Sequence, residues 1–321
     1  MTMMNAAVVT SFSEPPHYHP FAVPVPAEGE VLVDVLAAGL HPRVRTGAAG
    51  RHYTSSGTLP MIPGVDGVGR LPDGRLVYFA ADDDVLGTMA DKALADPCRS
   101  VELPAGADVA KIAAAMNPAM SSWVALRRRV PIQQGQSVLI LGATGNAGAM
   151  AVQVARRLGA GRVVGAGRDL GRLRALIPAG ADDVVQLTGD ARATASALAE
   201  AAAETDIVLD YLWGRPAQQA ITALLTARPD RGRALDWIQI GAVAGPTIEL
   251  PSVALRSANF RLQGSGQGSV SPRGYLAELP SLVEELGAGT IAVQTRTMPL
   301  SEVDKAWATK ETPGVRTVLV P

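Results

Sequence analysis

A cluster of small residues separates two apolar runs within residues 138–155, which read VLILGATGNAGAMAVQVA. The first run is typical of a buried strand, and the second has the spacing of a helix. The turn between them has small residues at Ala143, Gly145 and Gly148. A tight strand-to-helix turn alone would account for them. The sharper interpretation is that a large anion approaches the backbone there, because the N-terminus of a helix attracts negative charge.

This turn matches the dinucleotide fingerprint, since it follows a predicted strand, opens a predicted helix and leads to a second strand. It would hold the pyrophosphate of a bound dinucleotide, and its last glycine would let the helix pack closely on the strand. The residues expected to contact the cofactor here are Ala143, Gly145, Asn146, Ala147 and Gly148.

The end of the second strand, in RVVGAGRDLGRLR, indicates which nicotinamide cofactor fits. Sites for NAD place an acidic residue there, which binds the ribose hydroxyls. This chain has Gly167 at that position, followed by Arg168 and, one helical turn later, Arg172. Guanidinium groups bind phosphate with paired hydrogen bonds, so we expect NADPH. In the alternative interpretation both arginines are solvated helix residues, and Asp169 caps the helix in either case.

These residues need a sheet to position them. Residues 136–241 alternate between strand-like and helix-like segments, which favours a parallel sheet with helices on both faces. The first third is β-rich and crowded with turn signals. Residues 107–129 are helical in composition, and we expect Pro118 to break that helix. After Pro251 the pattern is mixed and ends in the strand-like VRTVLVP.

The amino-acid composition argues against several classes of partner and site. The 321 residues include 29 basic and 30 acidic side chains, and aromatic residues make up 4%, so we expect neither a nucleic-acid nor a membrane partner. The single cysteine, Cys98, excludes intrachain disulfides and multi-cysteine zinc sites. Because neither a signal peptide nor a membrane-length apolar run is found, we expect a cytoplasmic protein.

The order of segments resembles the medium-chain dehydrogenase/reductase superfamily, specifically its zinc-free quinone oxidoreductase (zeta-crystallin-like) branch. The segments that carry the resemblance span nearly the full chain: LAAGLHP, PMIPGVDGVG, AAAMNPAMSSWVAL, LILGATGNAGAMAVQVARRLGA, DIVLDYLWG, WIQIGAVAG, LQGSG and VRTVLVP. It implies an α/β fold in which a doubly wound Rossmann sheet is inserted into a GroES-like β-rich domain. The expected parts are the first part of the GroES-like catalytic domain at 1–117, the NADP(H)-binding domain at 118–255 and a return segment at 256–321 that completes the sheet and the catalytic domain.

The chain departs from its zinc-dependent relatives. Those carry a cysteine and a His-Glu pair where this chain has His41, Val65 and Asp66, so we expect no metal site. The zinc-free branch usually has asparagine at position 41, near the nicotinamide. There His41 would hydrogen-bond the carboxamide or a substrate oxygen, or alternatively would only pack. The stretch 69–95 is shorter than in most relatives, which implies that the substrate pocket is more open or is lined by different residues.

The resemblance also implies roles for residues outside the fingerprint. Tyr53 matches a position where a tyrosine often faces the substrate, so Tyr53 and His41 are the candidate catalytic residues; an ordinary loop aromatic is the alternative for Tyr53. The further cofactor-binding residues that it implies are Ser121, Gly241, Ala242, Gly264, Ser265 and Arg316. The LQGSG strand often forms the edge at which relatives dimerise, so we expect a homodimer.

The sequence therefore predicts a zinc-independent, NADPH-dependent reductase that transfers a hydride to a quinone or an activated enone. Two alternatives remain open. One is a non-catalytic NADPH-binding sensor or scaffold protein, and the other is an enoyl-thioester reductase.

Overall fold

The computed structural model describes residues 2–52, 54–81, 84–310, 312 and 314–321. The chain divides into two compact units. Unit 1 consists of Met1–Asn117 and Leu279–Pro321, and unit 2 of Pro118–Glu278. Of the expected return segment, residues 256–278 therefore belong to unit 2 and residues 279–321 to unit 1.

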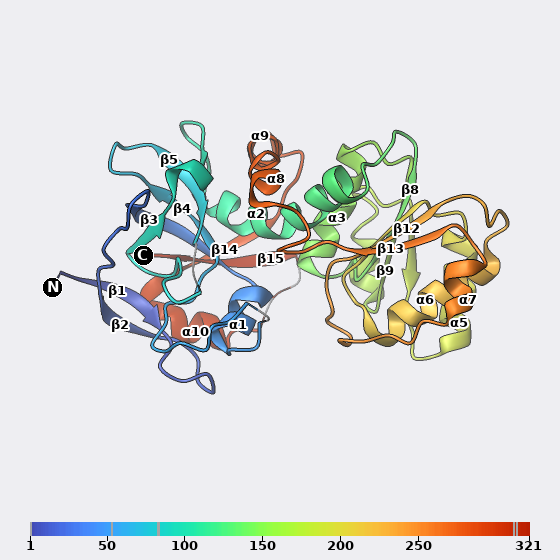
Figure 1. Ribbon diagram of the computed structural model, residues 1–321, viewed down its shortest axis with the longest axis horizontal. Coiled ribbons are helices and arrows are strands. Elements are labelled where there is room, and N and C mark those ends of the chain that lie inside the picture. Colours follow the sequence, from blue (N-terminus) through green and yellow to red (C-terminus); the bar gives the residue numbers. More distant parts are fainter. Residues whose placement is uncertain (1, 53, 82–83, 311, 313) are drawn as a thin grey trace. The chain divides into compact units, whose positions relative to one another are not determined.

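Unit 2 contains a parallel sheet in the order β10-β9-β8-β11-β12-β13. Strands β8, β9, β12 and β13 of this sheet are labelled in Figure 1. Its strands are β8 (Ser137–Leu141), β9 (Arg162–Gly167), β10 (Asp183–Gln186), β11 (Ile207–Asp210), β12 (Leu235–Gln239) and β13 (Phe260–Gly264). Its helices are α3 (Asn146–Arg157), α4 (Leu170–Arg174), α5 (Ala191–Ala202), α6 (Gly214–Ala227), α7 (Ser252–Arg256) and α8 (Pro272–Leu276). This is the doubly wound strand order of dinucleotide-binding sheets.

The strand order reverses between β8 and β11. The chain leaves β8 in one direction along the sheet and returns from β10 to β11 in the other. Because such crossovers are right-handed, α3 and α5 lie on opposite faces. Leu141 pairs with Asp210 in the ladder, so both strands end at the same edge. Sheets of this kind bind ligands in the crevice at that edge.

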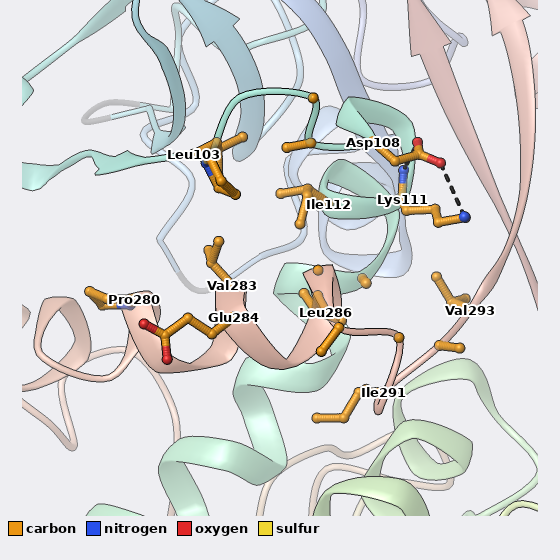
Figure 2. A pocket seen from close by; sticks show the side chains of 18 of the residues that line it. Leu103, Asp108, Lys111, Ile112, Pro280, Val283, Glu284, Leu286, Ile291 and Val293 are labelled. Carbon is orange, nitrogen blue, oxygen red and sulfur yellow. Dashed lines mark hydrogen bonds and ion pairs between the residues drawn. The ribbon is translucent and has the colours of Figure 1, made fainter.

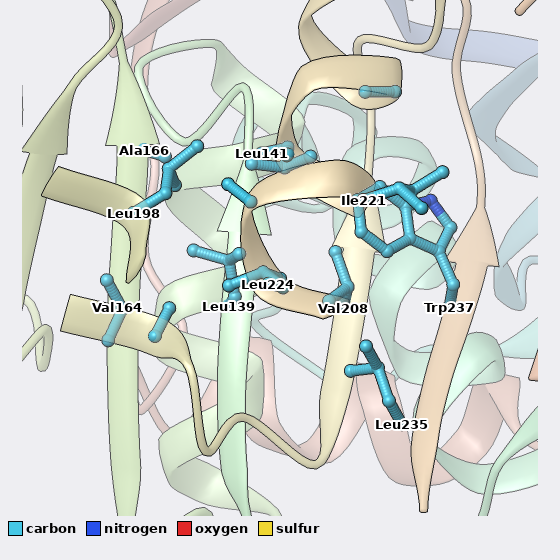
Figure 3. Close-up of a cluster of buried hydrophobic side chains, with 14 of the residues drawn as sticks. Leu139, Leu141, Val164, Ala166, Leu198, Val208, Ile221, Leu224, Leu235 and Trp237 are labelled. Atoms are coloured by element: carbon cyan, nitrogen blue, oxygen red, sulfur yellow. The ribbon is translucent and has the colours of Figure 1, made fainter. Parts of the chain in front are cut away.

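The core of unit 2 explains why these segments form strands and helices. On one face, Leu139 and Leu141 of β8 are buried together with Trp237 of β12 under α5 and α6 (Figure 3). The alternate residues Val138 and Ile140 point to the opposite face and are also fully buried. With both faces covered, β8 is a continuous apolar run, as buried parallel strands usually are.

Unit 1 is built around a mostly antiparallel sheet in the order β14-β15-β3-β4-β5-β7, with β6 paired to β3. Its elements are β1 (Met3–Val8), β2 (His17–Ala22), β3 (Val31–Leu40), α1 (Pro42–Ala48), β4 (Asp66–Arg70), β5 (Leu76–Ala80), β6 (Lys92–Ala95), η1 (Pro97–Arg99), β7 (Val101–Glu102), α9 (Leu279–Gly287), β14 (Gln294–Pro299), η3 (Leu300–Glu302), α10 (Val303–Ala308) and β15 (Val315–Val320). Strands from both ends of the sequence pair in it, as β15 does with β3. The predicted fold class, a Rossmann sheet with a separate β-rich part, is confirmed.

The expectation that Pro118 breaks a helix is wrong. Helix α2 (Val109–Val124) continues through Pro118 and is followed by a π-helical turn, η2 (Ala125–Arg129). Proline removes one backbone donor. The helix nevertheless buries Ile112, Met116 and Trp123, and this apolar burial outweighs the missing hydrogen bond. Within the described residues, no helix combines the length and apolarity needed to cross a bilayer.

Candidate active site

The glycine turn after β8 is shaped by contacts between its own backbone atoms. Gly142 has φ +88, a conformation that favours glycine. A Cβ at Gly148 would lie 2.3 Å from the carbonyl oxygen of Gly142 and 2.7 Å from the Cα of Ala143. Gly148 thus lets α3 start directly against the turn. A Cβ at Gly145 would meet only the Gly142 oxygen, at 3.5 Å, so local packing does not require glycine there.

Helix α3 starts without a capping side chain. In the described structure, its N-cap Gly145 makes no side-chain hydrogen bond and its first turn has no acidic residue. By contrast, Asp169 caps α4, as predicted, and Asp190 caps α5. Neither a capping side chain nor a first-turn acid therefore offsets the positive end of α3, which suits an external anion such as a pyrophosphate.

The end of β9 carries the residues predicted to select the cofactor. Gly167 is the last residue of β9 and is buried, while Arg168 is exposed. The backbone carbonyl of Arg168 accepts a hydrogen bond from Gln186 Nε2 at 3.0 Å. Arg172 is half-exposed, and its Nε lies 3.2 Å from the Asp169 carboxylate. The structure brings these residues to the same sheet edge as the glycine turn.

A buried carboxylate, Asp210, closes β11 at the point where the strand order reverses. Its Oδ1 accepts the backbone N–H groups of Leu212 and Trp213 at 2.8 and 2.9 Å, and its Oδ2 accepts Trp237 Nε1 at 3.1 Å. Burial raises the pKa of Asp210, while these three donors act against that rise. The carboxylate holds the chain in a tight turn in which Trp213 has φ +52.

Tyr211 follows Asp210 and was missed by sequence reasoning. Its hydroxyl lies 2.9 Å from the Oγ of Ser121, and Ser121 donates to the carbonyl of Pro118 at 2.8 Å. Burial raises the pKa of Tyr211 to about 12, although its hydrogen bonds to Ser121 and Ser122 lower it. The predicted residue Ser121 is therefore connected to the crevice edge through Tyr211. An aromatic residue directly after a predicted strand of the sheet was the only signal in the sequence.

The ends of β12 and β13 carry the remaining predicted residues of unit 2. A Cβ at Gly241 would lie 2.8 Å from the carbonyl oxygen of Tyr211, so β11 and β12 end in close contact. Ala242 is exposed. Ser265 is buried, and Gly264 accepts a hydrogen bond from Arg129 Nε at 2.9 Å.

In unit 1, His41 belongs to a buried hydrogen-bonded group. Its Nε2 lies 3.1 Å from Asp66 Oδ1, and Tyr78 donates its hydroxyl to Asp66 Oδ2 at 2.8 Å. Thr88 donates to the backbone oxygen of Asp66 at 2.8 Å. Burial, followed by the Asp66 charge, raises the pKa of Tyr78 well above its usual value, so Tyr78 stays protonated. The carboxylate can only accept from His41, which places a ring proton on Nε2.

Two further predicted residues belong to unit 1. Arg316 is buried in β15 and donates to the carbonyl of Leu40, the residue before His41, at 3.2 Å. Tyr53 lies outside the described residues. Its neighbour His52 has a lowered pKa because it is partly buried and close to Arg43.

The described residues contain no group of three histidine, cysteine, aspartate or glutamate side chains that could hold a metal ion. Unit 1 contains a pocket of about 870 Å³, which is separate from the predicted site residues (Figure 2). It is lined mainly by apolar side chains such as Ile112, Val283 and Leu286, with the Asp108–Lys111 pair at one side. It contains none of the predicted site residues.

Comparisons with known proteins show relatives and structural neighbours along the whole chain. No family model matches the chain. A protein of Emericella nidulans named probable NADPH-dependent quinone reductase is 33% identical, over 99% of this chain and 100% of that protein. The solved structure of a Pseudomonas syringae quinone oxidoreductase matches with a TM-score of 0.81 at 19% identity, over 100% of both chains. A mycobacterial protein solved in complex with NADPH matches with a TM-score of 0.80 at 20% identity, over 99% of this chain and 100% of that one. At these identities the solved structures show a shared fold.

Proposed function

Since the chain belongs to the quinone oxidoreductases of the medium-chain dehydrogenase/reductase superfamily, we propose that it is an NADPH-dependent reductase of quinones or activated enones. The observation that carries this proposal is the carboxyl edge of the unit 2 sheet. There an uncapped helix begins on a glycine turn, beside a strand that ends in Gly167 and Arg168 instead of an acid.

The residues at this edge fit NADPH. The turn from Ala143 to Gly148 with the start of α3 would hold the pyrophosphate, and the side chains of Arg168 and Arg172 would hold the 2′-phosphate. A Cβ at Gly145 would meet only the Gly142 oxygen, at 3.5 Å, so packing within the protein does not explain the glycine there. When bound, NADPH supplies the hydride. The proposed contacts of Ser121, Gly241, Ala242, Gly264 and Ser265 follow from their places at or beside the same edge.

The two candidate substrate classes differ in whether the protein must donate a hydrogen bond to the oxygen of the hydride acceptor. A quinone is a strong hydride acceptor and needs only to be oriented. An enone needs a donor that stabilises the developing enolate, and we propose His41 or Tyr53 for this role. With the Nε2 proton donated to Asp66, the other ring nitrogen of a neutral His41 would accept a hydrogen bond from the nicotinamide carboxamide. His41 would donate to a substrate oxygen only with both ring nitrogens protonated.

We also propose that the reaction does not use zinc. Val65 stands where zinc-dependent relatives have a ligand, and His41 is hydrogen-bonded to Asp66. A catalytic zinc site requires three protein ligands, and an imidazole beside one carboxylate does not supply them. The expected measurement is NADPH oxidation that persists after dialysis against a chelator.

Steady-state oxidation of NADPH with a quinone panel and an enone panel tests the function. Turnover with quinones and not with enones would identify a quinone reductase. Tight binding of NADPH without turnover on either panel, or on an enoyl-thioester, would instead support a sensor or scaffold protein. Absence of binding would contradict both.

A homodimer is proposed from the free edge of the unit 2 sheet. Within unit 2, all of which is described, β13 pairs with β12 alone. The helix α7 beside it exposes Val253 and Leu255, which would be covered if two β13 strands paired across a dimer axis. Light scattering coupled to size exclusion would report a mass of twice the chain; a monomer would contradict the proposal.

A further inference from the structure

The side chain of Thr144 fills the space that a side chain at position 167 would need. A Cβ built on Gly167 would lie 2.6 Å from Thr144 Cγ2 and 2.8 Å from Thr144 Oγ1. The backbone of Gly167 is not in the left-handed region, so any residue could adopt its conformation. Glycine is therefore favoured at 167 by the space next to Thr144 and not by φ.

The contact between the turn and β9 is fixed by backbone hydrogen bonds. The N–H groups of Gly142 and Ala143 both donate to the carbonyl of Ala166, each at 2.9 Å. The chain after Gly167 is held as well, because the N–H of Leu187 donates to the Gly167 carbonyl at 2.7 Å. The backbone on both sides of Thr144 and Gly167 is thus held in place, so only a rotation of the Thr144 side chain could relieve the contact.

Position 167 is where an NAD site would place its acidic side chain. That acid would collide with Thr144. The Thr144 side chain is partly exposed, and the exposed Arg168 follows Gly167 directly. The Thr144 hydroxyl therefore lies beside the position of an NAD-type acid, where a carboxylate would meet the Thr144 side chain, and the next residue supplies a guanidinium.

We propose that Thr144 determines the cofactor preference in two ways: it prevents an acid at 167, and it donates its hydroxyl to the 2′-phosphate of NADPH. This proposal rests on the proposed function, because it names a specificity residue within the same site. Threonine in the glycine turn would then act together with Arg168, which supplies the charge.

Single substitutions of Thr144 separate the hydroxyl from the volume. Thr144→Val keeps the shape over Gly167 and removes only the hydroxyl, so NADPH affinity should fall roughly tenfold with NADH affinity unchanged. Thr144→Ser keeps the donor and should bind NADPH almost as the wild type does. The readout is the dissociation constant from calorimetry, with no substrate present. An unchanged NADPH constant in Thr144→Val would overturn the role of the hydroxyl.

Double substitutions test the steric part. Gly167→Asp alone should lower the melting temperature and weaken both nucleotides, because the new side chain meets Thr144. Adding Thr144→Ala removes the two closest atoms and leaves Thr144 Cβ, 3.3 Å from the new Cβ. Thr144→Ala/Gly167→Asp should therefore regain stability and prefer NADH.

The matched control is Thr144→Val/Gly167→Asp, which retains the obstruction and should stay destabilised. Equal melting temperatures and equal NADH affinities in the two double variants would overturn the steric part. A wild-type protein that bound neither nucleotide would instead contradict the proposed function, so the two failures can be told apart.

Discussion

At the scale of single residues, Arg168 is the group whose loss should be most selective. Its side chain is exposed at the end of β9, free of the ion pair that ties Arg172 to Asp169. We predict that Arg168→Ala removes at least about a tenfold preference for NADPH over NADH, because a charged hydrogen bond contributes ~1.5–3 kcal/mol. Calorimetric titration with both nucleotides measures this. Arg172→Ala should have a smaller effect, and equal losses for both nucleotides in Arg168→Ala would contradict the assignment.

Tyr211 provides a prediction about alkaline pH. Burial raises its pKa to about 12 from the ordinary 10.0, so between these values the folded state holds a proton that the unfolded state releases. Its contribution to stability is complete below pH 10 and is lost as pH rises toward 12. With the pKa raised from 10.0 to about 12, the free energy of unfolding should fall by about 1.4 kcal/mol by pH 11 because of Tyr211 alone.

Tyr211→Phe lacks this titration. It should cost about 1 kcal/mol at pH 7 through the lost hydrogen bond to Ser121. Between pH 9 and 11, however, its free energy of unfolding should fall less steeply than that of the wild type, as urea denaturation would measure. Tyr78, whose pKa is also raised, is present in both proteins and so does not affect the difference. Parallel pH profiles would contradict the assignment.

At the scale of elements, the junction of β8 with α3 contains two glycines that we expect to have different roles. Gly148 is needed for packing, and Gly145 is needed for cofactor binding. A Cβ at Gly148 would overlap backbone atoms of Gly142 and Ala143, whereas one at Gly145 would make an ordinary contact. We predict that Gly148→Ala destabilises the protein by ~1–3 kcal/mol or more. Gly145→Ala should unfold like the wild type in urea but bind NADPH more weakly, since its methyl group would crowd the pyrophosphate that we propose to bind at this turn. Equal losses of stability in the two variants would contradict this division.

The sequence predicted this junction well because its signals are local. The strand pattern, the helix pattern and the glycine spacing are all contained in residues 138–155. Asp169 directly precedes its helix, which predicts that it is the N-cap. Pro118 was misjudged because the burial of α2, a tertiary effect, outweighs a local penalty.

The hydrogen-bonded groups were not predictable in this way. His41, Asp66 and Tyr78 come from separate segments that the pairing of β3, β4 and β5 brings together. The hydroxyls of Ser121 and Tyr211 are 90 positions apart in the chain. No pattern in a short window records such contacts, so Asp66 and Tyr211 emerged only with the fold.

At the scale of the whole molecule, the two units divide the proposed work. The parallel sheet, its core and the residues from Ala143 to Arg172 belong to unit 2, whereas His41, Tyr53 and Arg316 belong to unit 1. The resemblance to relatives implies that Arg316 lies near a cofactor phosphate, which stays a prediction. In the structure Arg316 is buried in β15 and donates to the Leu40 carbonyl. A fragment that contains unit 2 alone can therefore show whether cofactor selectivity comes from the residues between Ala143 and Arg172 or from Arg316 in unit 1.

We predict that residues 109–278, which keep α2 whole, unfold cooperatively in urea, because a sheet covered on both faces contains a complete core. This fragment should retain the NADPH-to-NADH affinity ratio of the full chain within about threefold by calorimetry, since Arg168 and Thr144 are present. It should oxidise NADPH with quinones far more slowly than the full chain, because the residues of unit 1 that would orient the acceptor are missing. A folded fragment that bound both nucleotides equally would assign the recognition of the 2′-phosphate to unit 1, with Arg316 as the residue to test next.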